Sequence, residues 1–244
     1  MDLPPPQVDR SHYFKGYDSA GRFSSYWHQV EEASELGGRV VEIGTGNGTV
    51  AAVLRARGLD VTTVDIDEKL GPDVVADVRR LPFPDGSFDT VLGAEILEHM
   101  PWEELPLAVS ELSRVARRGA VVSVPNSDVT LTLMARVPNA LQVCRMLFRG
   151  RLRVRDALWT LMQSPTWKRS GGRVEQLAEI GRLNREASPL SKQHFWELGI
   201  GEVRSEDFVS VFEGAGFRLR RTYRGPGYPY HHFFVFERGD APPA

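Results

Sequence analysis

Residues 39–48 read Arg-Val-Val-Glu-Ile-Gly-Thr-Gly-Asn-Gly, and this stretch decides the fold. Its first half holds three β-branched residues, which is typical of a buried strand, and three glycines then follow at alternate positions. The glycines predict a tight turn, because glycine accepts positive φ and lets a ligand approach the backbone closely. Residues 49–57 predict a helix, since apolar residues recur on one face and Gly58 stands just past its end. The first amides of this helix favour a negatively charged group at the turn.

A glycine-rich turn alone does not identify the ligand. The dinucleotide fingerprint G-x-G-x-x-G would require a third glycine where Thr49 stands. The chain has E-x-G-x-G-x-G instead, beginning at Glu42, and this pattern resembles motif I of the class I S-adenosylmethionine (SAM)-dependent methyltransferases. The resemblance implies that the cofactor is SAM and that five residues of this stretch contact it: Glu42, Gly44, Thr45, Gly46 and Gly48.

A second predicted strand, residues 59–65, ends in an acid. In a βαβ nucleotide fold, an acid about 20 residues after the first glycine lies at the end of the second strand and accepts ribose hydroxyls. Asp65 stands at this distance from the glycine turn, but NAD and SAM both carry a ribose, so the acid does not separate them. The alternative role for Asp65 is a helix N-cap. The resemblance also implies that Ile66 packs on the adenine face.

The third predicted strand and the loop that follows it contain the most specific motif. A short predicted strand over residues 74–76 is closed by Asp77, and prolines and an Asp-Gly pair then break the chain before the next strand, residues 88–92. The acid followed by "LPFPDGSFD" closely resembles the methyltransferase family 11 group. The resemblance implies that Asp77 accepts from the adenine amino group and that the Val78 backbone addresses the ring edge.

The segment after the fourth strand, residues 93–101, resembles the family's "xxxLEH" motif. Glu95 would lie over the methionine end of the cofactor, where an anion suits an ammonium and a sulfonium cation. His99 is a candidate base, with packing or capping as the alternative. A helix is predicted over residues 103–118, ended by Gly119 and followed by a strand over 120–124.

Residues 205–216 predict another helix, and 217–223 and 232–238 predict two last strands. "AGF" before this strand pair resembles the ends of class I methyltransferases. The expected fold class is therefore α/β: a Rossmann-like class I methyltransferase fold in one domain, with a mostly parallel seven-stranded sheet, a C-terminal antiparallel hairpin and a helical insertion. The SAM-binding core would comprise residues 38–126 and 205–238.

Before the core, residues 12–36 predict an N-terminal helical cap. Phe23, Tyr26, Trp27 and Val30 recur at helical spacing, which predicts an amphipathic helix packed on the core. The alternative is that Tyr26 or His28 faces the ligand, because an N-terminal helix often covers the cofactor in the family that the chain resembles.

The family pattern stops over residues 127–204. Between residues 136 and 186, eleven Arg or Lys stand against four Asp or Glu. This basic helical insertion is either a solvated surface or an acceptor lid that receives an anionic or lipid-linked molecule or rests on an acidic membrane surface. Aromatic and histidine residues near its end and in the last hairpin could line an acceptor pocket, and His194 and His231 join His99 as candidate catalytic residues, each with plain packing as the alternative.

The composition indicates the general class of the protein and where it is expected to be found. The chain has 244 residues, a net charge of −2 and 41% apolar residues, as expected for a soluble globular protein and not for a nucleic-acid binder. A single cysteine excludes an internal disulfide framework and a cysteine metal cluster. The sequence shows no strong metal constellation, no signal peptide and no apolar run of ~20 residues, so we expect no metal and a cytoplasmic location.

The sequence therefore predicts a SAM-dependent methyltransferase that acts on a small molecule or a glycan or lipid intermediate. Possible peripheral membrane contact would run through the basic insertion, and neither the acceptor nor the oligomeric state is predicted. Two alternatives stay open at this point. One is an NAD-type oxidoreductase, which Thr49 and Asp77 disfavour, and the other is a catalytically inactive SAM-binding partner protein.

Overall fold

A seven-stranded sheet in the order β3-β2-β1-β4-β5-β7-β6 forms the centre of the computed structural model. The structure describes residues 4–6, 9–127, 193–200, 203–225 and 227–239. The strands are β1 (Arg39–Ile43), β2 (Asp60–Asp65), β3 (Val74–Val75), β4 (Phe88–Ala94), β5 (Ala116–Pro125), β6 (Phe217–Arg224) and β7 (His231–Arg238). The first five run parallel, and β7 pairs antiparallel with both β5 and β6. The predicted mostly parallel sheet with a terminal hairpin is confirmed.

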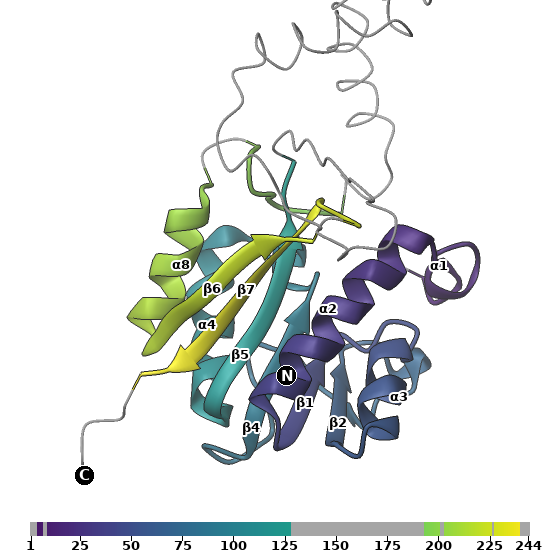
Figure 1. The fold of residues 1–244 in the computed structure, drawn as a ribbon, viewed down its shortest axis with the longest axis horizontal. Helices are drawn as coiled ribbons and strands as arrows, with labels where there is room; N and C mark the ends of the chain where they lie inside the picture. The colour runs from purple at the N-terminus through teal and green to yellow at the C-terminus, as the bar shows by residue number, and fades with distance from the viewer. Residues whose placement is uncertain (1–3, 7–8, 128–192, 201–202, 226, 240–244) are drawn as a thin grey trace, which may run out of the picture. The chain divides into compact units, whose positions relative to one another are not determined.

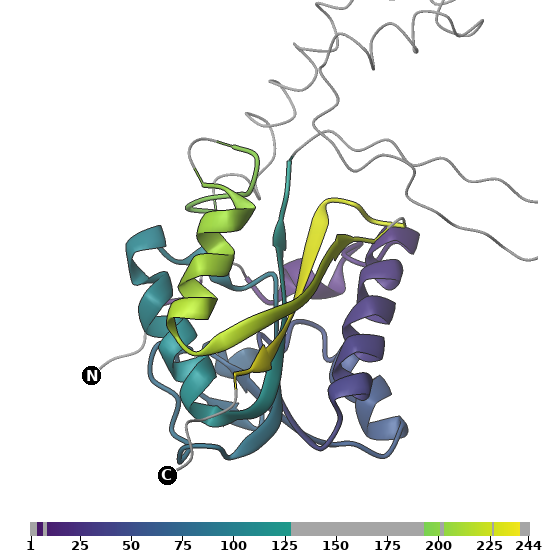
Figure 2. The ribbon, with the colours of Figure 1, turned by 60° about the vertical axis from the view of Figure 1, so that its left-hand side comes forward.

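Helices cover both faces of this sheet (Figures 1 and 2). The described helices are α1 (Ser11–Phe14), α2 (Ala20–Leu36), α3 (Thr49–Ala56), α4 (Leu105–Val115) and α8 (Ser205–Gly214), with short 3₁₀ turns η1 (Glu68–Leu70), η2 (Leu97–His99) and η3 (Trp102–Glu104). In Figure 2 the sheet is seen nearly edge-on, with α2 and α3 on one side and α4 and α8 on the other. The parallel strands therefore end at one edge, where the loops that follow them meet.

Each face has its own buried apolar cluster, because successive side chains of a strand point to opposite faces. On the α2 and α3 side, Leu92 and Val121 of the sheet pack with Leu54 of α3. On the α4 and α8 side, the cluster is rich in phenylalanine, and the rings of Phe212 and Phe236 stack with centroids 4.3 Å apart. These two cores fix the central strands, whose ends carry the candidate site.

The predicted helix over residues 103–118 is too long. Helix α4 ends at Val115, and β5 begins at the next residue. Arg117 and Arg118 form ion pairs with Asp89 at the start of β4, at 3.1 and 3.3 Å, which holds this segment in the sheet. Gly119 does not end a helix: a Cβ there would overlap the carbonyl oxygen of Phe236, so glycine permits the close approach of β7.

The predicted apolar face of the N-terminal helix is also wrong in part. Phe23 and Trp27 are 54% and 56% exposed, and the Arg57 guanidinium lies 5.3 Å from the Trp27 ring centre. The buried face of α2 is largely polar and consists of Ser25, Gln29, Val30, Glu32 and Ala33. Glu32 accepts from the Tyr223 hydroxyl at 2.7 Å and from Arg221. The helix therefore docks on the last hairpin through hydrogen bonds, which the apolar spacing could not reveal.

The basic insertion lies mostly outside the described residues. Its described end, residues 194–200, packs on the sheet: the Leu198 amide donates to the Pro125 carbonyl at 3.0 Å, and the Ser127 amide donates to the Leu198 carbonyl at 2.9 Å. Trp196 is buried and donates from Nε1 to the Met100 carbonyl at 3.1 Å. Within the part of the chain that the structure describes, no helix is long and apolar enough to cross a membrane.

Candidate active site

The glycine turn follows β1 and leads into α3. Gly44, Gly46 and Gly48 all have positive φ, of 87°, 52° and 75°. A Cβ on Gly44 would overlap Cγ2 of Ile96, so this glycine lets the turn pack against the segment after β4. A Cβ on Gly48 would meet nothing within 4 Å, and one on Gly46 would meet only the Tyr13 ring, at 3.8 Å. The first glycine is thus required by the protein itself, whereas the other two border open space or the N-terminal segment.

Asp65 ties this turn to the end of β2. Its Oδ2 accepts from the Thr45 amide at 2.7 Å, and its Oδ1 accepts from the Asp67 amide at 2.9 Å. Burial raises the pKa of Asp65 although these backbone bonds act in the opposite direction. The N-cap of η1 is Asp67, which accepts from the Lys69 amide, and not Asp65. Ile66, the expected adenine contact, is half-buried beside this carboxylate.

Asp77 at the end of β3 is held by Arg79, a residue that the sequence analysis missed. The Arg79 amide and its Nε both donate to Asp77 Oδ1 at 2.9 Å, and its guanidinium also pairs with Glu104. Burial raises the pKa of Asp77, but the hydrogen bonds from Arg79 outweigh it and lower the pKa overall. The Val78 side chain is buried in the α4-side core. The carboxylate thus already has a cation as its partner, two residues along the chain.

Two buried oxygens close to the turn have no hydrogen-bond partner among the described residues: Glu42 Oε2 and Thr45 Oγ1. Burial raises the pKa of Glu42 to about 8, although Arg55 and a hydrogen bond from the Ala51 amide act in the opposite direction. Unpaired buried polar atoms are rare in proteins and call for an explanation such as a ligand. These two lie at the foot of the glycine turn.

Glu95, after β4, has φ of 53°, a conformation that is uncommon for a residue with a side chain. Its Oε1 accepts from the Ser123 hydroxyl at 2.8 Å, and its Oε2 lies 3.4 Å from His231 Nε2. Burial raises the pKa of Glu95 to about 8 and lowers the pKa of His231 to about 3. His231 is therefore neutral near pH 7, and its Nδ1 is paired with the Ser25 hydroxyl at 2.7 Å.

The structure brings two of the three candidate histidines together. His99 in η2 and His194 lie with ring centres 5.1 Å apart, in an edge-to-face arrangement beside Glu98. His231 lies with Glu95 instead. His232, an expected lining residue, is held between Asn126 and Thr222 and stacks on Phe234, which is a packing role.

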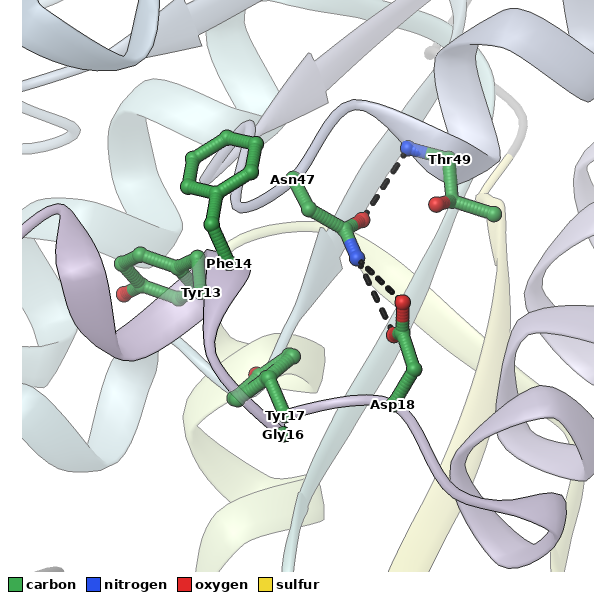
Figure 3. Close-up of a pocket in the computed structure, with 7 residues that line it drawn as sticks. All are labelled: Tyr13, Phe14, Gly16, Tyr17, Asp18, Asn47 and Thr49. Carbon is green, nitrogen blue, oxygen red and sulfur yellow. Dashed lines mark hydrogen bonds between the residues drawn. The ribbon is translucent and has the colours of Figure 1, made fainter.

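An N-terminal segment lines a pocket of about 320 Å³ next to the turn. Tyr13, Phe14, Tyr17 and Asp18 line it together with Asn47 and Thr49, and Asp18 points toward Asn47 (Figure 3). Asn47, which the sequence analysis overlooked, donates to Asp18 Oδ1 at 3.0 Å and accepts from the Thr49 amide at 3.1 Å. Asparagine between two glycines is a turn signal that could have identified it.

Tyr13 lies between the glycine turn and the segment after β4. Burial raises its pKa, and the negative charges of Asp65 and Glu98 act in the same direction. Tyr17 is fixed by Arg22, whose guanidinium stands 3.7 Å from the ring centre. The N-terminal segment thus covers the ends of β1 and β4.

A family model described as a methyltransferase domain matches residues 41–124, which include the glycine turn, Asp65, Asp77 and Glu95. The chain thus contains a methyltransferase domain over residues 41–124, about a third of its length. It is 29% identical to a probable SAM-dependent methyltransferase of Mycolicibacterium smegmatis, over 75% of this chain and 81% of that protein. It is 34% identical to a phosphatidylethanolamine N-methyltransferase of Cereibacter sphaeroides, over 37% of this chain.

The chain spans only about half the length of several curated relatives that it matches, with 51% of the Cereibacter protein and 44% of a Mycobacterium methyltransferase. Among solved structures, it resembles a magnesium protoporphyrin IX methyltransferase of Synechocystis PCC 6803 that contains S-adenosylhomocysteine, with a TM-score of 0.54 and 18% identity. That likeness covers 97% of this chain and 91% of the other and supports the fold.

Proposed function

We propose that this methyltransferase binds SAM at the ends of β1 to β4 and transfers its methyl group to a small-molecule or a lipid- or glycan-linked acceptor. The observation that carries the proposal is the glycine turn with unpartnered buried oxygens at its base, inside the segment that matches the family model. Polar groups of a bound amino acid and nucleoside would satisfy these oxygens.

The cofactor contacts follow from where the acids lie. Asp65 has lone pairs left after accepting from Thr45 and Asp67, so it can also accept from ribose hydroxyls. Glu95 is expected near the ammonium and sulfonium charges. Glu42 would orient the turn through the Ala51 amide, and Ile66, Asp77 and Val78 are the proposed adenine neighbours. Tyr13 and Tyr17 would cover the bound cofactor as part of an N-terminal cap spanning residues 12–36.

The bound cofactor supplies an electrophilic methyl group on a sulfonium. The protein's own part is to align the acceptor, to exclude water and to hold charges in place. Glu95 is held in place by Ser123 and His231, and a cation bound beside it would favour its ionised form. With its lowered pKa and a partner on each ring nitrogen, His231 would position Glu95 and would not act as a base.

A lipid-linked acceptor has one further point in its favour. The Cereibacter relative acts, by its name, on phosphatidylethanolamine, a membrane lipid with an anionic phosphate. The basic insertion would be the acceptor lid, and it could bring the protein to an acidic membrane surface from the cytoplasm. These roles rest on sequence, because residues 128–192 lie outside the described part of the chain.

Calorimetry with SAM, S-adenosylhomocysteine and NAD, followed by transfer from methyl-labelled SAM into separate lipid and water-soluble fractions, tests the proposal. We expect binding of both SAM and its product, no binding of NAD and label in one fraction. NAD binding without SAM binding would overturn it. SAM binding with no transfer to either fraction would favour a SAM-binding partner protein that has lost catalysis.

A further inference from the structure

We propose that Glu98, His99 and His194 bind a divalent first-row transition-metal cation beside the cofactor site. Each offers one ligand atom, and these atoms all lie within 4.8 Å of one another. Two imidazoles and one carboxylate are a donor set that Zn²⁺, Fe²⁺ and related ions take in proteins. The sequence predicted no metal, because His194 is far from the Glu98-His99 pair along the chain and only the fold brings them together.

Glu98 is the observation that points to a ligand. Its side chain is fully buried, and neither carboxylate oxygen has a hydrogen-bond partner among the described residues. Protonation alone would not resolve this, because a neutral carboxyl group still presents a donor and an acceptor that need partners. A cation that also binds the two neighbouring imidazoles would neutralise the carboxylate and give its oxygens a partner.

His194 is oriented as metal-binding histidines usually are. Its Nδ1 is paired with Glu197 Oε1 at 2.9 Å, and Glu197 Oε2 accepts from the Ser127 hydroxyl at 2.7 Å. A carboxylate on one ring nitrogen fixes the tautomer and leaves Nε2 as the ligand atom. The Phe195 amide donates to the Glu98 carbonyl at 2.8 Å, so the backbone also fastens this segment to η2.

The separations suit a cation after small side-chain movements. Two ligands of one such ion at roughly 2.0–2.2 Å each can stand at most about 4.4 Å apart. His99 Nε2 and Glu98 Oε1 are 4.0 Å apart, so this pair already falls within that span. The remaining pairs, within 4.8 Å, would close through rotation of the histidine side chains.

The position of the cluster suggests a role for the metal ion in methyl transfer, and this role rests on the proposed function. The cluster follows β4 directly, and Ile96 of the same segment packs against Gly44 of the glycine turn. The cation would take a hydroxyl oxygen of the acceptor as a ligand and promote release of its proton to water. The oxygen then forms a bond to the methyl carbon as the carbon–sulfur bond breaks, and the electron pair of that bond returns to sulfur. The acceptor class is thus a molecule with a hydroxyl group.

The test titrates chelator-treated full-length protein with Mn²⁺, read as loss of the free-ion electron paramagnetic resonance signal, and with Co²⁺, read by absorption. We expect one ion per chain, at least tenfold weaker binding in Glu98→Gln and in His194→Asn, and a retained circular dichroism spectrum. The matched control is His28→Asn, a half-buried histidine that contacts Tyr223 on the last hairpin, and its affinity should equal the parent's.

Failure of the metal site and failure of the proposed function give different results. The metal site is refuted if neither ion binds the parent. It is also refuted if Glu98→Gln and His28→Asn both bind the ions as the parent does. SAM calorimetry on the same samples then tests the proposed function separately. If the ions bind as expected but SAM does not, the metal site stands and the methyl-transfer role fails. Substitution at His99 adds a second check, since His99→Asn should weaken both ions in the same way.

Discussion

The acids at the edge of the sheet and those at its centre are held in different ways. Towards the β3 edge, Asp65 of β2 and Asp77 after β3 accept from backbone amides or from Arg79. At the centre, Glu42 of β1 and Glu98 after β4 are buried and have oxygens without partners among the described residues. Burial raises the pKa of both central acids, whereas Arg79 leaves Asp77 with a lowered pKa.

The difference separates acids whose bonds are made within the protein from acids with oxygens left for a ligand. The edge acids stabilise turns: Asp77 accepts from Arg79, and Asp65 accepts from Asp67 and from Thr45 of the glycine turn. The partners that Glu42 and Glu98 lack among the described residues would come from a bound molecule or ion. Burying a carboxylate without partners is costly, and this cost is the reason for the binding roles proposed above.

The largest expected effect is at the centre, in Glu42→Gln. The folded-state pKa of Glu42, about 8, lies above its ordinary value of 4.5, so the folded state holds the proton and the parent loses stability as pH rises from 4.5 to 8. Glutamine does not titrate. The free energy of unfolding of the variant should therefore rise relative to that of the parent by about 1.4 kcal/mol per pH unit, or roughly 3 kcal/mol between pH 5 and 7. Urea unfolding at four pH values measures the difference.

The control for this variant is Glu213→Gln, at an exposed position of α8, measured at the same pH values. A flat difference for Glu42→Gln would show that Glu42 ionises normally, and the contrast between edge and centre would then fail at β1.

A smaller effect is expected at the edge in Asp65→Ala, measured as SAM affinity by calorimetry. The variant loses the link between the turn and β2 as well as the proposed ribose acceptor. Losing charge-assisted hydrogen bonds of roughly 1.5–3 kcal/mol each should weaken SAM at least tenfold. Asp60→Asn, on the exposed start of the same strand, is the control and should bind as the parent does. An Asp65→Ala protein that is folded and binds SAM normally would remove this acid from the site.

The smallest effect is expected in Asp77→Asn. Its lowered pKa means that the carboxylate stabilises the fold above its unfolded-state pKa and loses that contribution as pH falls below about 4. The ion pair is partly exposed, so the variant should lose about 1 kcal/mol or less at pH 7 and less than that at pH 3. The sign is opposite to that for Glu42→Gln, and urea midpoints at both pH values measure it. Equal loss at both would mean that the charge of Asp77 contributes nothing.

The sequence was sufficient wherever a feature is local. The glycine turn and the acid that ends β2 follow from residues close together in the chain, and they are as expected. The mostly parallel sheet was expected from the resemblance of several motifs in order to a known family, and it is confirmed. The contact of Arg79 with Asp77 is also local. Two arginines after an acid are, however, equally typical of exposed, solvated side chains, so the pattern did not predict this contact. The end of α4 was misplaced because helical periodicity continues past Val115, while the ion pairs to Asp89 that start β5 are distant in sequence.

The part of the site that residues 194–198 contribute could not be predicted from the order of residues along the chain. His194 meets His99 only through the return of residues 194–198 to the end of β5, which no spacing encodes. The docking of α2 has the same cause, since its partners Arg221 and Tyr223 lie on the last hairpin. The apolar spacing that singled out Phe23 and Trp27 carried no information about a face that binds through polar groups.

The backbone pairing of Ser127 with Leu198 has a consequence for how the chain could vary. The points where residues 128–193 leave and rejoin the sheet are joined by two amide-to-carbonyl bonds and by the Ser127 hydroxyl on Glu197. With its two ends fastened to each other, a loop can change length at a closure cost that rises only with the logarithm of its length, about 0.6 kcal/mol per doubling. Segments of different size and chemistry could be exchanged at this junction while the strands beneath it keep their register.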